Sequence, residues 1–238
     1  MRFFIPEPLV AHSEFTLPDD VAHHLVRVLR CEPGTRLTLF NGQGGAWEAE
    51  LVEAGKKSAR GRLLAFAPDN RQSPLHTHLG QVMSKGDRMD YAIQKATELG
   101  VSEITPLTSE RCELRLRGEE RADKKLEHWR RVALSACEQS GRNIPPLIHE
   151  PCALPEWSAR LHCDLKLVLA PGVAGALPAE RIASAALLIG PEGGLSDTEI
   201  AAAQARGFQP WQLGPRVLRT ETAPVVALAL LQARFGDL

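Results

Sequence analysis

The stretch that decides the fold is Ala185–Glu199, which reads AALLIGPEGGLSDTE. Its first five residues are all apolar, as expected of a strand that is buried on both faces. The next five, Gly190–Gly194, form a loop rich in glycine and proline. Ser196 and Glu199 then have the spacing of a capping box, which marks the start of a helix. The stretch therefore predicts a buried strand, a glycine loop and a helix in direct succession.

The same alternation of strand and helix extends from residue 79 to residue 234. The predicted strands are 79–83, 103–108, 165–169, 185–189 and 211–213, and the predicted helices are 87–99, 122–140, 197–206 and 222–234. Glycines follow three of these helices, as is usual at a helix end: Gly100, Gly141 and Gly207. Apolar strands that alternate with helices predict an α/β domain whose parallel sheet is covered on both faces.

The first 70 residues have a different pattern, typical of short strands. Strands are predicted at 36–40, 46–52 and 60–67, with a glycine-rich hairpin loop between the first two. One helix begins at Asp19 or Asp20. Its apolar side chains are expected on one face: Val21, Leu25, Val28 and Leu29. These elements predict a small β-barrel with one helix.

Residues 68–74 are polar, carry a proline at each end and are typical of a linker. The sequence therefore predicts two domains, 1–70 and 74–238.

Composition excludes several classes of protein. The chain of 238 residues has a net charge of −1, so a globally basic nucleic-acid coat is excluded, although a local basic patch is not. Its longest apolar run, 223–231, is too short for a membrane span. The five cysteines show no C-x-x-C spacing, which disfavours a disulfide framework. We expect a cytoplasmic protein that makes no membrane contact.

A metal site is also disfavoured. His76 and His78 alternate on a predicted strand and so share one face, but the sequence shows no evident third ligand.

Three loops follow predicted strands of the parallel sheet, at the edge where ligands bind in such sheets. They are 170–172, 190–194 and 214–220, and all are rich in glycine or proline. Each alone is explained as a tight turn, but three at successive strand ends favour a site whose backbone reads a ligand such as adenine. The chain has no G-x-G-x-x-G or P-loop motif, which disfavours an ordinary dinucleotide or nucleoside triphosphate site.

Two groups of cations are candidates for binding an RNA backbone, although solvated surface is the better explanation of either group taken alone. The candidate RNA-binding residues are Lys56, Lys57, Arg60, Arg62, Arg111 and Arg115. The first four form a run with no acid between them and lie in the β-rich domain.

Segments spread over nearly the whole chain carry a resemblance to a known family. Residues 189–196 and 213–223 resemble the S-adenosylmethionine site of the knotted SPOUT methyltransferases. Residues 85–90, 94–100 and 138–142 narrow the resemblance to the enzymes that methylate N3 of a uridine in 16S ribosomal RNA of the small subunit. Cys112 is a mild departure, because a serine is expected there.

The resemblance implies a fold, a cofactor and partners. The N-terminal domain would be a PUA-like β-barrel, and the C-terminal domain would carry a trefoil knot that binds S-adenosylmethionine without any metal. The enzyme would form a homodimer through the last helix, which is more apolar than one buried face requires. The implied cofactor-binding residues are Leu169, Ala170, Gly190, Pro191, Glu192, Gly193, Gly194, Leu213, Gly214, Val217, Leu218, Arg219, Thr220 and Ala223.

The implied reaction narrows the catalytic candidates without deciding between them. Uridine N3 carries a proton and becomes nucleophilic when that proton leaves, so the site needs a base or cations that stabilise the anion. Glu221 or Glu98 would take the proton, and Arg219, Arg142 or Arg111 would stabilise the charge. Two alternatives stay open: a SPOUT enzyme that methylates another atom, such as a ribose 2′-hydroxyl, and an RNA-binding protein without catalysis.

Overall fold

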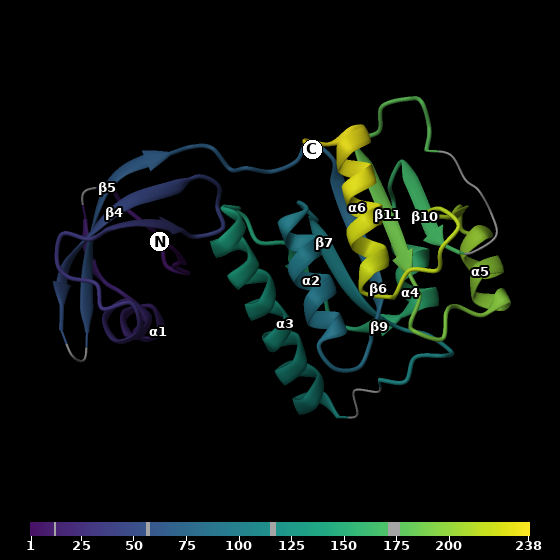
Figure 1. The fold of residues 1–238 in the computed structure, drawn as a ribbon, viewed down its shortest axis with the longest axis horizontal. Helices are drawn as coiled ribbons and strands as arrows, with labels where there is room; N and C mark the ends of the chain where they lie inside the picture. The colour runs from purple at the N-terminus through teal and green to yellow at the C-terminus, as the bar shows by residue number, and fades with distance from the viewer. Residues whose placement is uncertain (12, 56–57, 115–117, 171–176) are drawn as a thin grey trace. The chain divides into compact units, whose positions relative to one another are not determined.

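The computed structural model describes residues 1–11, 13–55, 58–114, 118–170 and 177–238, and the chain divides into two compact units (Figure 1). The first unit contains Met1–Gln72 together with Cys137–Pro145, and the second contains Ser73–Ala136 and Pro146–Leu238. The sequence predicts 74–238 as one domain, which would place residues 137–145 in the second unit. In the structure these residues belong to the first unit, where they contact Arg2 and Phe4. Arg2 Nη2 donates to Asn143 Oδ1 at 2.6 Å, and the Phe4 N–H donates to Glu138 Oε1 at 3.0 Å.

The first unit is built on a five-stranded sheet. Its strands are β1 (Arg2–Phe4), β2 (Glu14–Thr16), β3 (Arg36–Phe40), β4 (Ala46–Ala54) and β5 (Ala59–Ala67). They lie in the order β1-β3-β4-β5-β2, with β1 parallel to β3 and the other neighbours antiparallel. The predicted hairpin of β3 and β4 is present, and Gly42, Gly44 and Gly45 in its loop have positive φ.

The prediction of a barrel is wrong for this sheet, which is open. A barrel closes only when its two edge strands pair, and among the described residues β1 and β2 do not pair with each other. Both edge strands are only three residues long.

The predicted helix of this unit is shorter than expected and changes its winding. It consists of α1 (Asp19–His23) followed by the π-helical turn η1 (His24–Val28). Val21 and Leu25 are buried as predicted, whereas Val28 and Leu29 are 57% and 42% exposed. The π turn explains this difference, because its wider winding turns its last residue, Val28, and the following Leu29 away from the core face.

The second unit is a parallel sheet with helices on both faces. Its strands are β6 (His76–Val82), β7 (Glu103–Thr108), β8 (Leu147–Ile148), β9 (Cys152–Ala153), β10 (Leu165–Leu169), β11 (Ser184–Ile189) and β12 (Gln209–Trp211). The strand order is β12-β10-β11-β6-β7-β8, with β9 also paired to β7, and every pairing is parallel. The sheet class predicted from the sequence is therefore confirmed.

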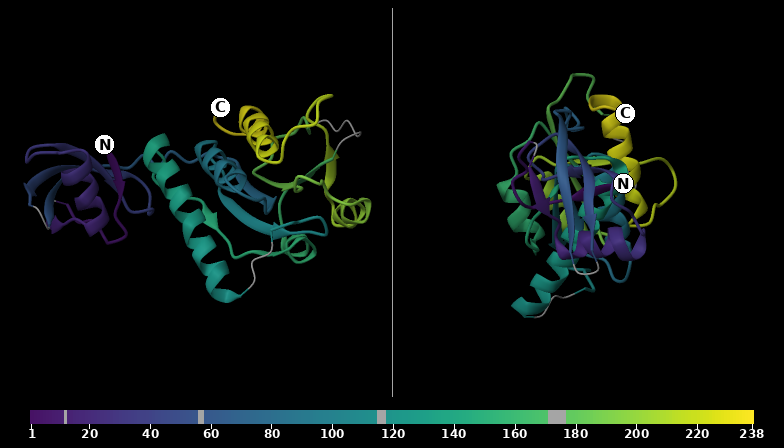
Figure 2. Two further views of the ribbon diagram at one scale, coloured as in Figure 1. Left: turned by 60° about the horizontal axis from the view of Figure 1, so that its bottom comes forward. Right: turned by 90° about the vertical axis from the view of Figure 1, so that its left-hand side faces the viewer.

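The helices of this unit are α2 (Arg88–Glu98), α3 (Glu119–Ser140), α4 (Leu154–Arg160), α5 (Asp197–Gln204) and α6 (Thr222–Phe235), although the last turn of α3, from Cys137, belongs to the first unit. Figures 1 and 2 show α2 and α6 side by side on one face of the sheet, with α4 and α5 on the other. The predicted capping box is present at the start of α5: the Glu199 N–H donates to Ser196 Oγ, and the Ser196 N–H donates to the Glu199 carboxylate.

Smaller differences from the predicted elements lie at the sheet edges. Strand β12 begins and ends two residues before the predicted 211–213 and includes Pro210, which an edge strand tolerates. Strands β8 and β9 were not predicted because two residues carry no periodic signal, and the seven-residue helix α4 was not predicted because it is too short to show a clear helical period. No helix among the described residues is both long and apolar enough to cross a membrane. The five cysteines are free thiols.

Candidate functional site

A pocket of about 820 Å³ lies at the carboxyl ends of β10, β11 and β12. Its walls come from the ends of these strands and from the loops that leave them. These loops include Gly190–Gly194 and the segment that leads to Glu221 and Ala223 at the start of α6. Two arginines from earlier in the chain, Arg88 and Arg111, complete the lining. The glycine loops singled out in the sequence are therefore brought together in one site.

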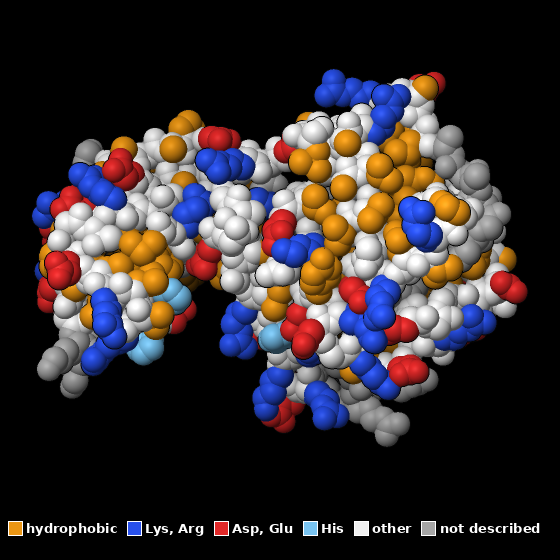
Figure 3. All heavy atoms as spheres, in the orientation of Figure 1, with side chains coloured by type: hydrophobic (Ala, Val, Ile, Leu, Met, Phe, Trp, Pro, Cys, Tyr) orange, Lys and Arg blue, Asp and Glu red, His pale blue; other side chains and the backbone are white. Residues whose placement is uncertain are grey.

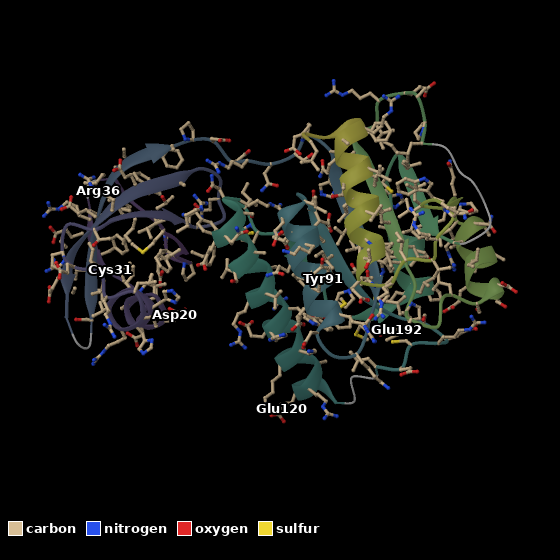
Figure 4. All side chains as sticks on the ribbon, viewed as in Figure 1. Asp20, Cys31, Arg36, Tyr91, Glu120 and Glu192 are labelled. Atoms are coloured by element: carbon tan, nitrogen blue, oxygen red, sulfur yellow. The ribbon has the colours of Figure 1, made fainter. Side chains whose placement is uncertain are left out.

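All of the predicted cofactor-binding residues line this pocket. They are Leu169, Ala170, Gly190, Pro191, Glu192, Gly193, Gly194, Leu213, Gly214, Val217, Leu218, Arg219, Thr220 and Ala223. Figure 4 labels Glu192 in the loop that leaves β11. Pro171 and Gly172, which belong to the first predicted loop, lie outside the described residues.

Side-chain hydrogen bonds fix the pocket loops to one another. Thr220 Oγ1 donates to the carbonyl oxygen of Gly190 at 2.7 Å and accepts from Gln81 Nε2 at 3.0 Å. Gln81 is fully buried near the end of β6, so the segment before α6 and the loop after β11 are both tied to the centre of the sheet. Arg111 Nη1 donates to the carbonyl oxygen of Gly193 at 3.0 Å. The backbone that would face a ligand is thus held in place before the ligand binds.

Glycine is required by space at Gly190. A Cβ there would lie 3.1 Å from the backbone nitrogen of Leu195, which is a rigid neighbour. Gly194 and Gly214, with φ of 69° and 78°, adopt the left-handed conformation that favours glycine. The glycine pattern in these loops therefore has a local structural cause.

The structure separates the four catalytic candidates into two pairs. Arg219 and Glu221 line the pocket, and Glu98 and Arg142 do not. Glu98 forms an ion pair with Lys95 on α2, at 2.8 Å. Arg142 is buried in the first unit, where its Nη2 donates to Gln72 Oε1 at 3.1 Å.

The predicted RNA-binding residues are also placed differently from one another. Arg60 and Arg62 both form ion pairs with Glu14, at 2.6 and 2.5 Å. The hydrogen bond from Arg62 lowers the pKa of the Glu14 carboxyl below its usual value. The run that looked free of acids is thus partly neutralised, because β2 pairs with β5 and brings Glu14 opposite Arg62.

Three of the predicted RNA-binding residues, Lys56, Lys57 and Arg115, lie outside the described residues. Arg111, the sixth, lines the pocket in the second unit.

At the opposite, amino edge of the same sheet, the structure gives His78 two further polar neighbours that the sequence did not show. Glu103 begins β7 beside His78, and His149 follows β8; each of the three offers an atom within 4.8 Å of the others. The sequence did not show this third group, because the three side chains come together only through the pairing of separate strands.

Hydrogen bonds define the state of this cluster. Trp157 Nε1 donates to His78 Nε2 at 3.1 Å, and Thr105 Oγ1 lies 2.8 Å from the same ring nitrogen. Burial lowers the pKa of His78 to about 4, which keeps the ring neutral. His149 Nε2 also hydrogen-bonds to the Glu103 carboxylate, so the polar side chains of this cluster have partners inside the protein.

With this geometry in hand, comparison with known proteins identifies the family. The model of the RNA methyltransferase domain matches residues 71–232, and that of the RNA methyltransferase PUA domain matches residues 17–64. The chain therefore belongs to the RNA methyltransferase family with a PUA domain.

Several similar proteins carry a more specific name than the family. Ribosomal RNA small subunit methyltransferase E of Buchnera aphidicola from Schizaphis graminum is 38% identical over 100% of this chain and 97% of its own length. The protein of the same name from Synechocystis is 34% identical over 98% of this chain and 77% of its own. The crystal structure of that methyltransferase from Neisseria gonorrhoeae, bound to S-adenosyl methionine, has a TM-score of 0.92 and 39% identity, covering 100% of this chain and 98% of that one.

Proposed function

We propose that this protein transfers a methyl group from S-adenosylmethionine to N3 of a uridine in 16S ribosomal RNA. The observation that carries the proposal is the pocket in which all the predicted cofactor residues meet, in a chain similar over its whole length to a relative solved with S-adenosyl methionine. The names of the relatives support small-subunit ribosomal RNA as the substrate. We place the enzyme in the cytoplasm, where that RNA is assembled into subunits.

The residues of the pocket suit this cofactor. Apolar side chains such as Ile189, Leu213 and Leu218 would pack against the adenosine, and the glycine loops would offer backbone N–H and C=O groups to the adenine edge. When bound, S-adenosylmethionine supplies a methyl group that is already activated by its sulfonium. Catalysis is then mainly a matter of positioning the uridine in line with that methyl group.

The remaining task is to remove the proton from N3. Glu221 lines the pocket and Glu98 does not, which favours Glu221 as the base. Arg219 also lines the pocket, where its guanidinium would stabilise negative charge on the uracil ring. In the balanced reaction, the N3–C bond forms as the S–C bond breaks, and the proton moves to the carboxylate, leaving S-adenosylhomocysteine.

The proposal also includes a trefoil knot and a homodimer. In the knot, the segment that contains Thr220 and precedes α6 would pass through a loop of the chain. The dimer would use the face of α2 and α6, where Figure 3 shows hydrophobic side chains gathered and where Tyr91 and Leu230 are each 45% exposed. We expect Leu230→Lys to yield monomers in light scattering, and a monomeric wild type at micromolar concentration would contradict the dimer.

The function is tested by mass mapping of 16S ribosomal RNA from cells that lack the gene. We expect one methyl group to be lost from one uridine and to be restored by the purified enzyme with S-adenosylmethionine. Location of the lost methyl group on a ribose would identify a 2′-hydroxyl methyltransferase instead. Failure of the purified protein to bind S-adenosylmethionine would indicate an RNA-binding protein without catalysis.

A further inference from the structure

Arg88 links two loops of the pocket. It is the first residue of α2 and lines the pocket, although the sequence analysis assigns it no role. Its Nη1 lies 2.6 Å from Oε1 of Glu192, in the loop after β11. Its Nε lies 4.0 Å from Oε2 of Glu221, which immediately precedes α6. One cation from the β6–α2 connection thus faces acids from two other connections of the sheet.

The Glu221 carboxylate depends on its surroundings for compensation. Its side chain is 17% exposed, and Oε2 is inaccessible to solvent and accepts no hydrogen bond from any residue in the described part of the chain. Although Glu221 is at the N-cap position of α6, it makes no capping hydrogen bond. Burial of a charged group without a partner is costly. The guanidinium of Arg88 is the nearby positive charge that offsets this cost.

The separation of 4.0 Å leaves Glu221 able to react. Hydrogen bonds between nitrogen and oxygen have distances of about 2.7–3.2 Å, so Arg88 compensates the charge without occupying the carboxylate oxygen. Its hydrogen bond is made instead to Glu192, which anchors the guanidinium. The arrangement holds the Glu221 side chain beside the pocket with its lone pairs unused.

We propose that Arg88 is a positioning residue that holds the Glu221 carboxylate where it accepts the proton from uridine N3. This inference rests on the proposed function. In the step, the N3–H bond breaks as the N3–methyl bond forms, the S–C bond of the cofactor breaks, and Glu221 becomes a carboxylic acid. Arg88 keeps its proton throughout.

The expected consequence for stability is small. The Arg88 side chain is 42% exposed, and exposed ion pairs contribute about 0–1 kcal/mol. Arg88→Ala, which leaves the Glu221 carboxylate without this compensation, should therefore lower the melting temperature only slightly while methyl transfer slows much more. A role in folding alone would show the reverse.

The test is a double-mutant cycle in single-turnover methyl transfer to small ribosomal subunits from cells that lack the gene. We expect Arg88→Ala and Glu221→Gln each to slow transfer by at least about tenfold, because each removes part of the same proton transfer. The double variant should be no slower than the slower single variant. Arg88→Lys, which keeps the charge, should restore part of the rate.

Lys85→Ala is the matched control. Lys85 precedes Arg88 by three residues and forms an ion pair of the same 2.6 Å length with Glu113, but it does not line the pocket. Its rate should equal that of the wild type. Independent, multiplying effects of Arg88→Ala and Glu221→Gln would overturn the proposal, as would wild-type transfer by Arg88→Ala.

Calorimetry separates this role from direct contact with the cofactor. S-adenosylmethionine carries a carboxylate that 5′-methylthioadenosine lacks, so an arginine bound to that carboxylate would matter for the first ligand alone. We expect Arg88→Ala to bind both ligands as the wild type does. A selective loss of affinity for S-adenosylmethionine would overturn the proposal, and a wild type that methylates no uridine would overturn the proposed function with it.

Discussion

The two edges of the parallel sheet differ in what they leave without a partner. At the amino edge, His78, Glu103, His149 and Trp157 hydrogen-bond or pack with one another. At the carboxyl edge, the glycine loops leave backbone groups facing a pocket of about 820 Å³. Both edges are rich in polar groups, and the pocket lies at the carboxyl edge. A cluster of reactive side chains is therefore weaker evidence for a site than polar groups that lack internal partners beside a cavity.

We expect the largest effect on stability from a substitution of Trp157 at the amino edge. This side chain is 4% exposed and packs directly over Gly80 of β6. We expect Trp157→Ala to lower the free energy of unfolding by about 3–5 kcal/mol, because it leaves a cavity. Affinity for S-adenosylmethionine should change by less than about twofold, since the two edges are separate. Urea denaturation and calorimetry measure the two quantities. A parallel loss of affinity would show that the edges are coupled.

Acid should destabilise the amino edge. Burial lowers the pKa of His78 from 6.5 to about 4, so between these pH values the unfolded chain binds more protons than the folded chain. Stability must then fall as the pH is lowered through this range, by about 1–3 kcal/mol for this group.

The control for this pH effect is His78→Gln, whose side-chain oxygen can still accept from Trp157. Urea denaturation at several pH values should give the wild type the steeper loss of stability. Equal slopes for the two proteins would contradict a buried, neutral His78.

At the carboxyl edge, a change should affect chemistry more than folding. Arg219 is exposed and lines the pocket. We expect Arg219→Ala to slow single-turnover methyl transfer about 100-fold, because the developing charge on uracil loses its stabilising cation. The melting temperature should stay close to that of the wild type. If rate and RNA affinity fell by the same factor, Arg219 would serve binding instead of transfer.

The smallest expected effect concerns the hydrogen bonds that hold the pocket loops. Thr220→Val removes the donor to Gly190 and the acceptor for Gln81. We expect affinity for S-adenosylmethionine to fall about tenfold, since two buried polar groups lose a partner. Thr108→Val, at an exposed position on β7, is the control and should bind normally. Unchanged affinity in Thr220→Val would mean that the loops keep their shape without this link.

Local patterns predicted much of this fold. Strands 103–108 and 165–169 have the predicted bounds, and the capping box at Ser196 marks the start of α5. These features depend on consecutive residues, so the sequence displays them directly. The glycine loops were also found from consecutive residues. Their common location could be predicted because parallel strands place their carboxyl ends at one edge of the sheet.

Features that depend on contact between distant segments were missed. Arg88 lies in the segment 85–90 that carries the resemblance, but the role proposed for it depends on its contacts with Glu192 and Glu221. The neutralisation of Arg60 and Arg62 required the pairing of β2 with β5. The open sheet and the π turn were missed because short edge strands and a change of winding leave no periodic trace.

The first unit is built from two separate stretches of the chain, and this affects how it can fold during synthesis. Residues 137–145 complete this unit and supply Glu138 and Asn143 to the strand that begins at Arg2. A chain emerging from the ribosome presents the first 72 residues long before these partners exist. The N-terminal unit must therefore wait, partly assembled, while more than sixty intervening residues are made. A fragment cut at the 68–74 linker would lack the same partners and should be a poor substitute for the unit in the intact chain.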